Sequence, residues 1–184
     1  MMRRAESCFM NIVLIGYRGA GKSTVGRMLA ARAGKTFVDA DERVEKQCGS
    51  SISDIVRSKG WQYFRDLEKG VIDEICRGNE LIIAPGGGAV LDPANVRALK
   101  KNGLVIWLKA DGEVLGRRIN QDPRTRASRP SLTGKGALED LQEVLFMRNP
   151  YYAAAADVQV DTSELSLEEV AEKVWSIVQK RRGA

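Results

Sequence analysis

The sequence predicts an α/β fold in which helices are layered against a parallel sheet. Short apolar runs alternate along the chain with longer segments of helical periodicity, an order typical of strands joined by crossover helices. The runs show little internal alternation and are bounded by turn residues, as expected for strands buried on both faces. They span residues 11–15, 36–39, 80–84, 103–108 and 157–161, of which the last is the most polar.

The segments between these runs predict helices that pack on the sheet. They cover residues 22–33, 41–48, 51–59, 61–77, 93–101, 111–119, 136–148 and 166–181. The last helix begins near Ser166 and Glu169, which have the spacing of a capping box. Residues 120–136 break the pattern because they are polar and lack apolar periodicity. A loop of this length in a compact domain is usually a functional lid or disordered, and its arginines favour a lid.

Length and composition are those of one globular domain. The chain has 184 residues, of which 43% are hydrophobic, and this is sufficient for one buried core over residues 1–184. No apolar run approaches the length of a membrane span or a signal peptide, so we expect a cytoplasmic protein without a membrane partner. Cys8, Cys48 and Cys76 form no C-x-x-C pair, and we expect free thiols.

Charge and residue usage narrow the function. Histidine is absent, which removes the commonest general base and metal ligand. The net charge of +5 could indicate nucleic acid, but many arginines lie in or beside one polar segment rather than along an aromatic-studded face. A small enzyme that binds a polyanionic nucleotide needs such charges. We therefore expect no nucleic-acid partner.

Residues 10–24, MNIVLIGYRGAGKST, place a glycine-rich loop between a predicted strand and a predicted helix. From Gly16 to Ser23 they read G-x-x-x-x-G-K-S, the pattern of a phosphate-binding P-loop. Inward-facing N–H groups and the helix N-terminus would bind phosphates. Lys22 would reach the β- and γ-phosphates, and the Ser23 hydroxyl would ligate Mg²⁺. The alternative is a glycine-rich turn that matches by chance, but both flanks favour binding of a nucleoside triphosphate.

Two aspartates follow the second predicted strand, in the sequence FVDAD. Asp39 and Asp41 would project to the same side of an extended chain. If this strand lies near the first, both carboxylates face the P-loop at the carboxyl ends of the strands, where open α/β sheets bind ligands. Asp39 would then hold Mg²⁺ through water, and Asp41 would orient and deprotonate an attacking hydroxyl. The alternative is that Asp41 only caps the next helix.

Three consecutive glycines follow the third predicted strand. After Pro85, the residues Gly86, Gly87 and Gly88 would cost chain entropy unless the backbone bends sharply or approaches something closely. They form either a backbone surface for a ligand or a tight turn, and composition does not choose between these two.

Arginines supply further candidates. Arg65 could clamp a substrate carboxylate bidentately, or it could pair with Glu68 on a helix surface. Arg148 lies just before Asn149-Pro150, at the position of a helix-terminal cation. Arg129, within 120–136, is the best candidate for stabilising the charge of a transferring phosphoryl group.

Taken together, these stretches resemble the shikimate kinase family from Ile12 to the C-terminal helix. The matches are GYRGAGKSTVGR, DAD, FRDLE, PGGG, RPSLTGKG and RNPYY, and their order and spacing are more specific than any single motif. The resemblance implies a nucleoside-monophosphate-kinase-like fold with a central five-stranded parallel sheet. Its core and nucleotide site would be 10–40, 78–119 and 157–184, its substrate-binding region about 41–77 and its lid about 120–136. It also implies ATP- and Mg²⁺-dependent phosphorylation of the 3-hydroxyl of shikimate, in aromatic amino-acid biosynthesis.

The resemblance also implies roles for individual residues. The shikimate-binding set would be Asp41, Arg65, Gly86, Gly87, Gly88 and Arg148, with both arginines on the carboxylate. The ATP-binding set would be Gly19, Ala20, Gly21, Lys22, Ser23, Thr24, Arg118 and Arg129. Magnesium would be served by Ser23 and Asp39, and catalysis by Lys22, Asp41 and Arg129. Arg118 is the better match to the family's adenine-stacking arginine, although Arg117 is adjacent.

Two departures from the family pattern touch no residue assigned to chemistry. Trp61 follows Gly60 where many members have Glu, and the segment RPSL stands where RPLL is commoner. One alternative function is a P-loop kinase for another small hydroxy acid such as gluconate. Another is a non-catalytic ATP-binding regulator. The expected partner is a small-molecule substrate, and we expect a monomer.

Overall fold

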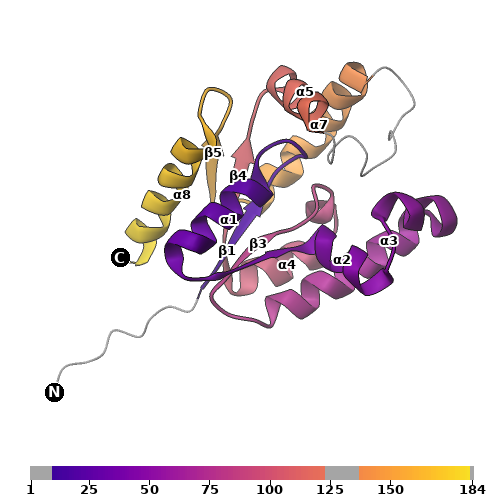
Figure 1. The fold of residues 1–184 in the computed structure, drawn as a ribbon, viewed down its shortest axis with the longest axis horizontal. Helices are drawn as coiled ribbons and strands as arrows, with labels where there is room; N and C mark the ends of the chain where they lie inside the picture. Colours follow the sequence, from indigo (N-terminus) through magenta and orange to yellow (C-terminus); the bar gives the residue numbers. More distant parts are fainter. Residues whose placement is uncertain (1–9, 123–136, 183–184) are drawn as a thin grey trace.

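A computed structural model describes residues 10–122 and 137–182. Within these residues, five strands form one parallel sheet in the order β2-β3-β1-β4-β5 (Figure 1). The strands are β1 (Asn11–Ile15), β2 (Thr36–Asp39), β3 (Leu81–Ala84), β4 (Gly103–Lys109) and β5 (Val158–Asp161). Every pairing is parallel. The predicted fold class is confirmed, and each apolar run became a strand.

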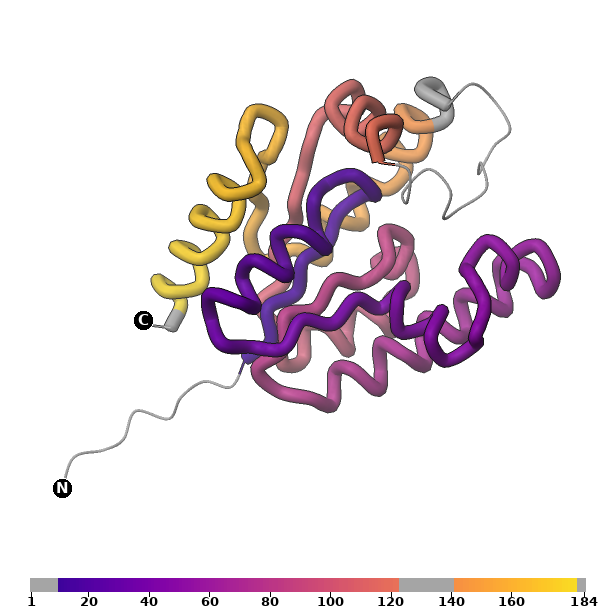
Figure 2. Tube along the Cα trace, viewed as in Figure 1, coloured from indigo at the N-terminus to yellow at the C-terminus, as the bar shows by residue number. Residues whose placement is uncertain are grey.

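Helices surround this sheet, and Figure 2 traces their path along the chain. They are α1 (Lys22–Ala33), α2 (Ala40–Cys48), α3 (Ile52–Cys76), the 3-10 helix η1 (Ala89–Leu91), α4 (Pro93–Lys101), α5 (Gly112–Gln121), α7 (Ala137–Ala155) and α8 (Leu167–Arg182). Glycines in the left-handed conformation end α1 and α2, as is common for helices.

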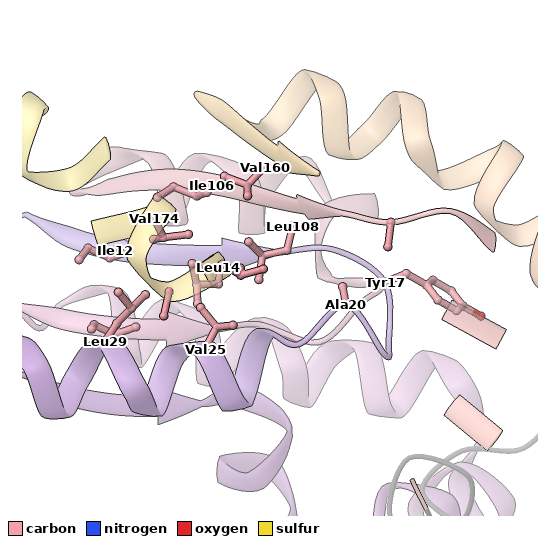
Figure 3. Packing of buried hydrophobic residues seen from close by; sticks show 14 of the residues in the cluster. Ile12, Leu14, Tyr17, Ala20, Val25, Leu29, Ile106, Leu108, Val160 and Val174 are labelled. Atoms are coloured by element: carbon pink, nitrogen blue, oxygen red, sulfur yellow. The ribbon is translucent and has the colours of Figure 1, made fainter. Parts of the chain in front are cut away.

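Both faces of the sheet are buried, because alternate residues of each central strand enter different clusters. In β1, Ile12 and Leu14 pack with α1 and α8, as Figure 3 shows, while Val13 and Ile15 pack with α2, α3 and α4. In β4, Ile106 joins the first cluster and Val105 the second. This burial explains why the apolar runs lack the alternation of a half-exposed strand.

The connections after β1 and β3 leave the sheet in opposite directions. β1 and β3 are neighbours, with Ile12 opposite Ile82. The chain after β1 enters α1 on one face, whereas the chain after β3 enters η1 and α4 on the other. Divergent loops at the carboxyl ends of adjacent parallel strands leave a crevice between them, which is where open α/β sheets bind ligands.

Helix α3 corresponds to two predicted helices joined at a kink. Gly60 has non-helical angles, φ 83° and ψ 169°, at the gap between the predicted segments 51–59 and 61–77. Ser51 caps the start of α3 by accepting a hydrogen bond from the Asp54 N–H. The helix axis therefore changes direction at Gly60.

The prediction that a helix ends at Arg148 is wrong. Helix α7 continues through Pro150 to Ala155, so Arg148 lies within a helix rather than at its terminus. Proline removes one helical hydrogen bond. Tertiary packing offsets that loss, since Tyr152 and Ala155 are 1% and 3% exposed beneath the sheet. The Ala156 N–H also donates to the Tyr152 carbonyl and closes the final turn.

The predicted lid, 120–136, falls mainly outside the described residues. Its first two residues belong to α5, which extends to Gln121 rather than ending at 119. Across residues 10–122 and 137–182, the structure contains no helix with both the length and the apolar character needed to span a membrane.

Candidate active site

A cavity of about 890 Å³ opens at the carboxyl ends of the strands. Its walls come from the P-loop, the first turns of α1 and α2, helices α3, α5 and α7, the loop after β3, and the segment that leads into α8. The predicted site residues that line it are Gly19, Gly21, Lys22, Ser23, Thr24, Asp39, Asp41, Arg65, Gly87, Arg118 and Arg148. The cavity therefore brings the P-loop, both aspartates and both predicted carboxylate-binding arginines to one place.

The P-loop wraps the N-terminus of α1. Gly21 is the N-cap, with φ 90°, a conformation that residues other than glycine rarely adopt. The Lys22 ammonium donates to the carbonyls of Gly16 at 2.9 Å and Tyr17 at 3.1 Å, so its side chain lies along the loop. Ala20 is buried in the core at 2% exposure and does not line the cavity.

Asp39 connects the P-loop to the start of α2. One carboxylate oxygen, Oδ2, accepts a 2.6 Å hydrogen bond from the Ser23 hydroxyl. The other, Oδ1, caps α2 by accepting from the N–H groups of Asp41 at 3.0 Å and Glu42 at 3.4 Å. Ser23 and Asp39 thus lie together, as their predicted magnesium roles require.

The geometry expected for Asp41 is wrong, although its location is as predicted. Asp41 lies in the first turn of α2, not in an extended chain, and the cap of that helix is Asp39. The helix starts directly after β2, so its first turn remains at the cavity and Asp41 lines it. The alternative that Asp41 only caps this helix is therefore wrong, because Asp39 is the N-cap.

Arg65 is held in place from three sides. Its guanidinium forms an ion pair with Glu68, which is fully buried rather than on the helix surface. The guanidinium carbon lies 5.6 Å from the Trp61 ring centroid and 5.2 Å from that of Phe64, distances at which cation–π attraction operates. Trp61 itself lines the cavity. Arg65 therefore has a fixed direction, and part of its charge faces the cavity.

The glycine-rich loop after β3 serves two purposes. Gly87 lines the cavity, whereas Gly86 and Gly88 do not. A Cβ atom on Gly88 would lie 2.3 Å from an Arg65 guanidinium nitrogen, so glycine there leaves room for the arginine. The Tyr152 hydroxyl donates to the Gly87 carbonyl, and its ring stacks on Trp107 at 5.7 Å. The loop is both a wall of the cavity and a turn, so the ligand-surface and tight-turn interpretations of the glycines are compatible.

Arg118 lies at the other end of the cavity, beside the segment before α8. Its guanidinium donates to the Thr162 hydroxyl at 3.0 Å and to the Thr162 carbonyl at 2.6 Å. Burial lowers the pKa of Arg118, and the neighbouring charge of Arg117 acts in the same direction. Leu167, 40% exposed, lines the cavity here and offers an apolar surface. Arg117 does not line the cavity, so Arg118 is the better placed of the adjacent pair.

One predicted site residue lies outside the described part of the chain, and three residues without a predicted role line the cavity. Arg129 lies outside the described residues, and its role stays a prediction. Sequence reasoning gave no role to Arg18, Trp61 or Leu167, although all three line the cavity. Trp61 was visible as a departure from the family pattern, and Arg18 occupies a variable position of the P-loop pattern. Leu167 carried no signal of its own.

Comparison with known proteins agrees with these features. A family model for shikimate kinase matches residues 18–179. The shikimate kinase of Syntrophus aciditrophicus is 40% identical over 98% of this chain and 97% of its own length. That of Symbiobacterium thermophilum is 41% identical over 94% of this chain and 98% of its own length. The structure of shikimate kinase from Acinetobacter baumannii in complex with shikimate superposes with a TM-score of 0.88, at 31% identity and 97% coverage of both chains. This chain therefore belongs to the shikimate kinase family.

Proposed function

We propose that this protein transfers the γ-phosphoryl group of ATP to the 3-hydroxyl of shikimate, giving shikimate 3-phosphate and ADP. The family to which it belongs is one of ATP-dependent kinases. The observation that carries the proposal is the shared cavity, in which Asp41 and Arg65 face the same space as Lys22 of the P-loop. A nucleotide phosphate and an acidic alcohol can meet there.

The P-loop side would bind the triphosphate. Backbone N–H groups from Gly19 to Thr24 and the N-terminus of α1 provide donors and partial positive charge for phosphate oxygens. Lys22 would exchange its contacts with the carbonyls of Gly16 and Tyr17 for phosphate oxygens. The donor set fits a hard divalent cation, because Ser23 and Asp39 supply oxygens 2.6 Å apart. Magnesium bound there would neutralise charge on the phosphates, and Asp39 would serve it through water.

Asp41 would act on the acceptor hydroxyl. Phosphoryl transfer passes through a loose transition state, so an oriented carboxylate that accepts the hydroxyl proton suffices as the base. The first turn of α2 is a rigid support for this group, because Asp39 fixes the Asp41 N–H. Gly87, tied by Tyr152, would present its backbone to the ring hydroxyls of the acceptor.

Arg65 and Arg148 would bind the acceptor carboxylate. Arg65 is only 26% exposed and is braced by Glu68, so its free edge is pre-oriented for a bidentate contact. Arg148 approaches from α7, with its guanidinium carbon 5.7 Å from the Tyr17 ring centroid. Cations on two different helices would orient the acid end so that the alcohol points to the phosphate.

The test is ADP release by the purified protein at fixed ATP and magnesium, with and without shikimate. We expect shikimate to stimulate ADP release, and removal of magnesium by a chelator to abolish the stimulation. Gluconate and the methyl ester of shikimate serve as comparison acceptors. Stronger stimulation by gluconate would assign another hydroxy acid as substrate. ATP binding without stimulation by any acceptor would favour a non-catalytic regulator.

Other features of the proposal rest on the sequence. The proposal also includes charge stabilisation by Arg129, substrate binding by residues 41–77, a monomeric state and a cytoplasmic location. The arrangement of α2 and α3 supports the second of these, because both helices supply walls to the acceptor side of the cavity.

A further inference from the structure

A third arginine, Arg18, lines the cavity together with Arg65 and Arg148. Arg18 follows Tyr17 in the P-loop, at a position that the phosphate-binding pattern leaves open. Its guanidinium carbon lies 5.6 Å from the Tyr17 ring centroid. Among the side chains of residues 10–122 and 141–181, none accepts a hydrogen bond from this guanidinium or pairs with its charge, and its Nε is buried.

A buried donor on a charged group is costly unless something accepts from it. Arg148 shares the same aromatic ring, with its guanidinium carbon 5.7 Å from the centroid, and within the described parts of the chain it too lacks a carboxylate partner. The Tyr17 ring is only 4% exposed and so is a fixed platform. Two like charges gathered on one ring without a counter-charge indicate a site that is completed by an anion.

The position of the Arg18 backbone favours the acceptor acid over the nucleotide phosphates as this anion. The Arg18 N–H lies 3.5 Å from the point where a Cβ of Gly87 would stand, so this part of the P-loop contacts the glycine-rich loop after β3. The phosphate-facing part of the P-loop comes later, from Gly19 to Thr24, and leads into α1. The backbone of Arg18 therefore lies beside Gly87, the wall of the cavity that would face the acceptor.

We propose that Arg18 and Arg148 together grip the acceptor carboxylate, so that Arg18 is a specificity-determining residue. The inference rests on the proposed function, since it assumes an acidic acceptor. Arg18 would donate through its two terminal nitrogens, a bidentate contact that favours a planar carboxylate over a neutral group. Arg65, whose charge Glu68 already offsets, would contribute the third side of the clamp.

The test compares Arg18→Met, which keeps the length but removes the charge, with Arg18→Lys, which keeps the charge but not the fork. For Arg18→Met we expect the KM for shikimate to rise about 10- to 100-fold, with the KM for ATP unchanged, because contacts to a charged group are lost. Arg18→Lys should recover only part of this loss. Arg57→Met, an exposed arginine on α3 that pairs with Asp54, is the matched control and should behave as wild type.

The methyl ester of shikimate separates a carboxylate contact from a general disturbance of the loop. Removing Arg18 should cost the ester much less than the acid, so the preference for the acid shrinks. An unchanged KM for shikimate in folded Arg18→Met would overturn the inference, as would equal losses for acid and ester or a raised KM for ATP. In these three cases the wild type still responds to shikimate and the proposed function stands. A wild type that shows no response to shikimate overturns both.

Discussion

At the scale of single residues, the site depends on side chains whose direction is fixed by a second group. Glu68 and two aromatic rings hold Arg65, and Tyr152 holds the Gly87 carbonyl. Asp41 follows an aspartate that fixes its backbone N–H. Such support is what lets a charged group act at a chosen distance from a substrate, since it need not be reorganised during the reaction.

Replacing Asp41 by Asn should remove the proton acceptor while keeping the shape of the side chain. We expect Asp41→Asn to lower kcat for shikimate about 100- to 10,000-fold, the range lost with a positioned general base. The affinity for ATP should change little. Steady-state kinetics and equilibrium nucleotide binding provide the two measurements, and exposed Asp66→Asn on α3 is the control. Equal losses in turnover and ATP binding would point to a structural role for Asp41.

Cys76 provides a prediction about pH. Burial, reinforced by the nearby Asp73 carboxylate, raises the pKa of the Cys76 thiol from 9.0 to about 11. Because the thiolate is the reactive form, iodoacetamide should label Cys76 at pH 8 about 100-fold more slowly in the folded protein than in the unfolded chain. Between these two pKa values the unfolded state binds fewer protons than the folded one, so stability falls as pH rises.

The labelling is measured in a Cys8→Ser, Cys48→Ser variant so that Cys76 is the one remaining thiol. Equal labelling rates for the folded and unfolded chains would show that the thiol is open to solvent.

At the scale of elements, the kink in α3 precedes Arg65, which we propose binds the acceptor. Gly60 divides the helix, and the half after it carries Trp61, Arg65 and Glu68. The predicted helical segments 51–59 and 61–77 placed this division correctly at Gly60. The sequence pattern failed at Pro150, since the local cost of proline in a helix does not reveal the buried Tyr152 and Ala155 that compensate for it.

Two glycines in the same helix offer a matched test of the kink. Gly60→Ala should lower the free energy of unfolding by about 1–3 kcal/mol, because alanine is strained at φ 83° and ψ 169°. Gly70→Ala, at an ordinary helical position, should be neutral or stabilise by up to about 1 kcal/mol. Neither Cβ would meet another atom within 4 Å, so packing does not confuse the comparison. Urea denaturation measures both, and equal effects would show that α3 can straighten.

At the scale of the whole molecule, the sheet could be predicted almost completely from the chain, whereas the cavity could be predicted only in outline. Strands buried on both faces leave a strong local signal, and the P-loop identifies the edge at which ligands bind. The wall residues Arg18 and Leu167 left no comparable signal, because their positions depend on how distant segments meet. The same reason explains why Asp41 was placed correctly at the cavity but on the wrong kind of backbone.

Asp39 has a consequence for how the two substrates influence each other. One of its oxygens accepts a hydrogen bond from the Ser23 hydroxyl, and the other accepts one from the Asp41 N–H at the start of α2. A cation bound by Ser23 and Asp39 would change the contact between Asp39 and the start of that helix. Binding of the metal and nucleotide would therefore change the affinity for the acid. By thermodynamic reciprocity, the factor by which the bound metal and nucleotide change the affinity for the acid must equal the factor by which the acid changes the affinity for the nucleotide.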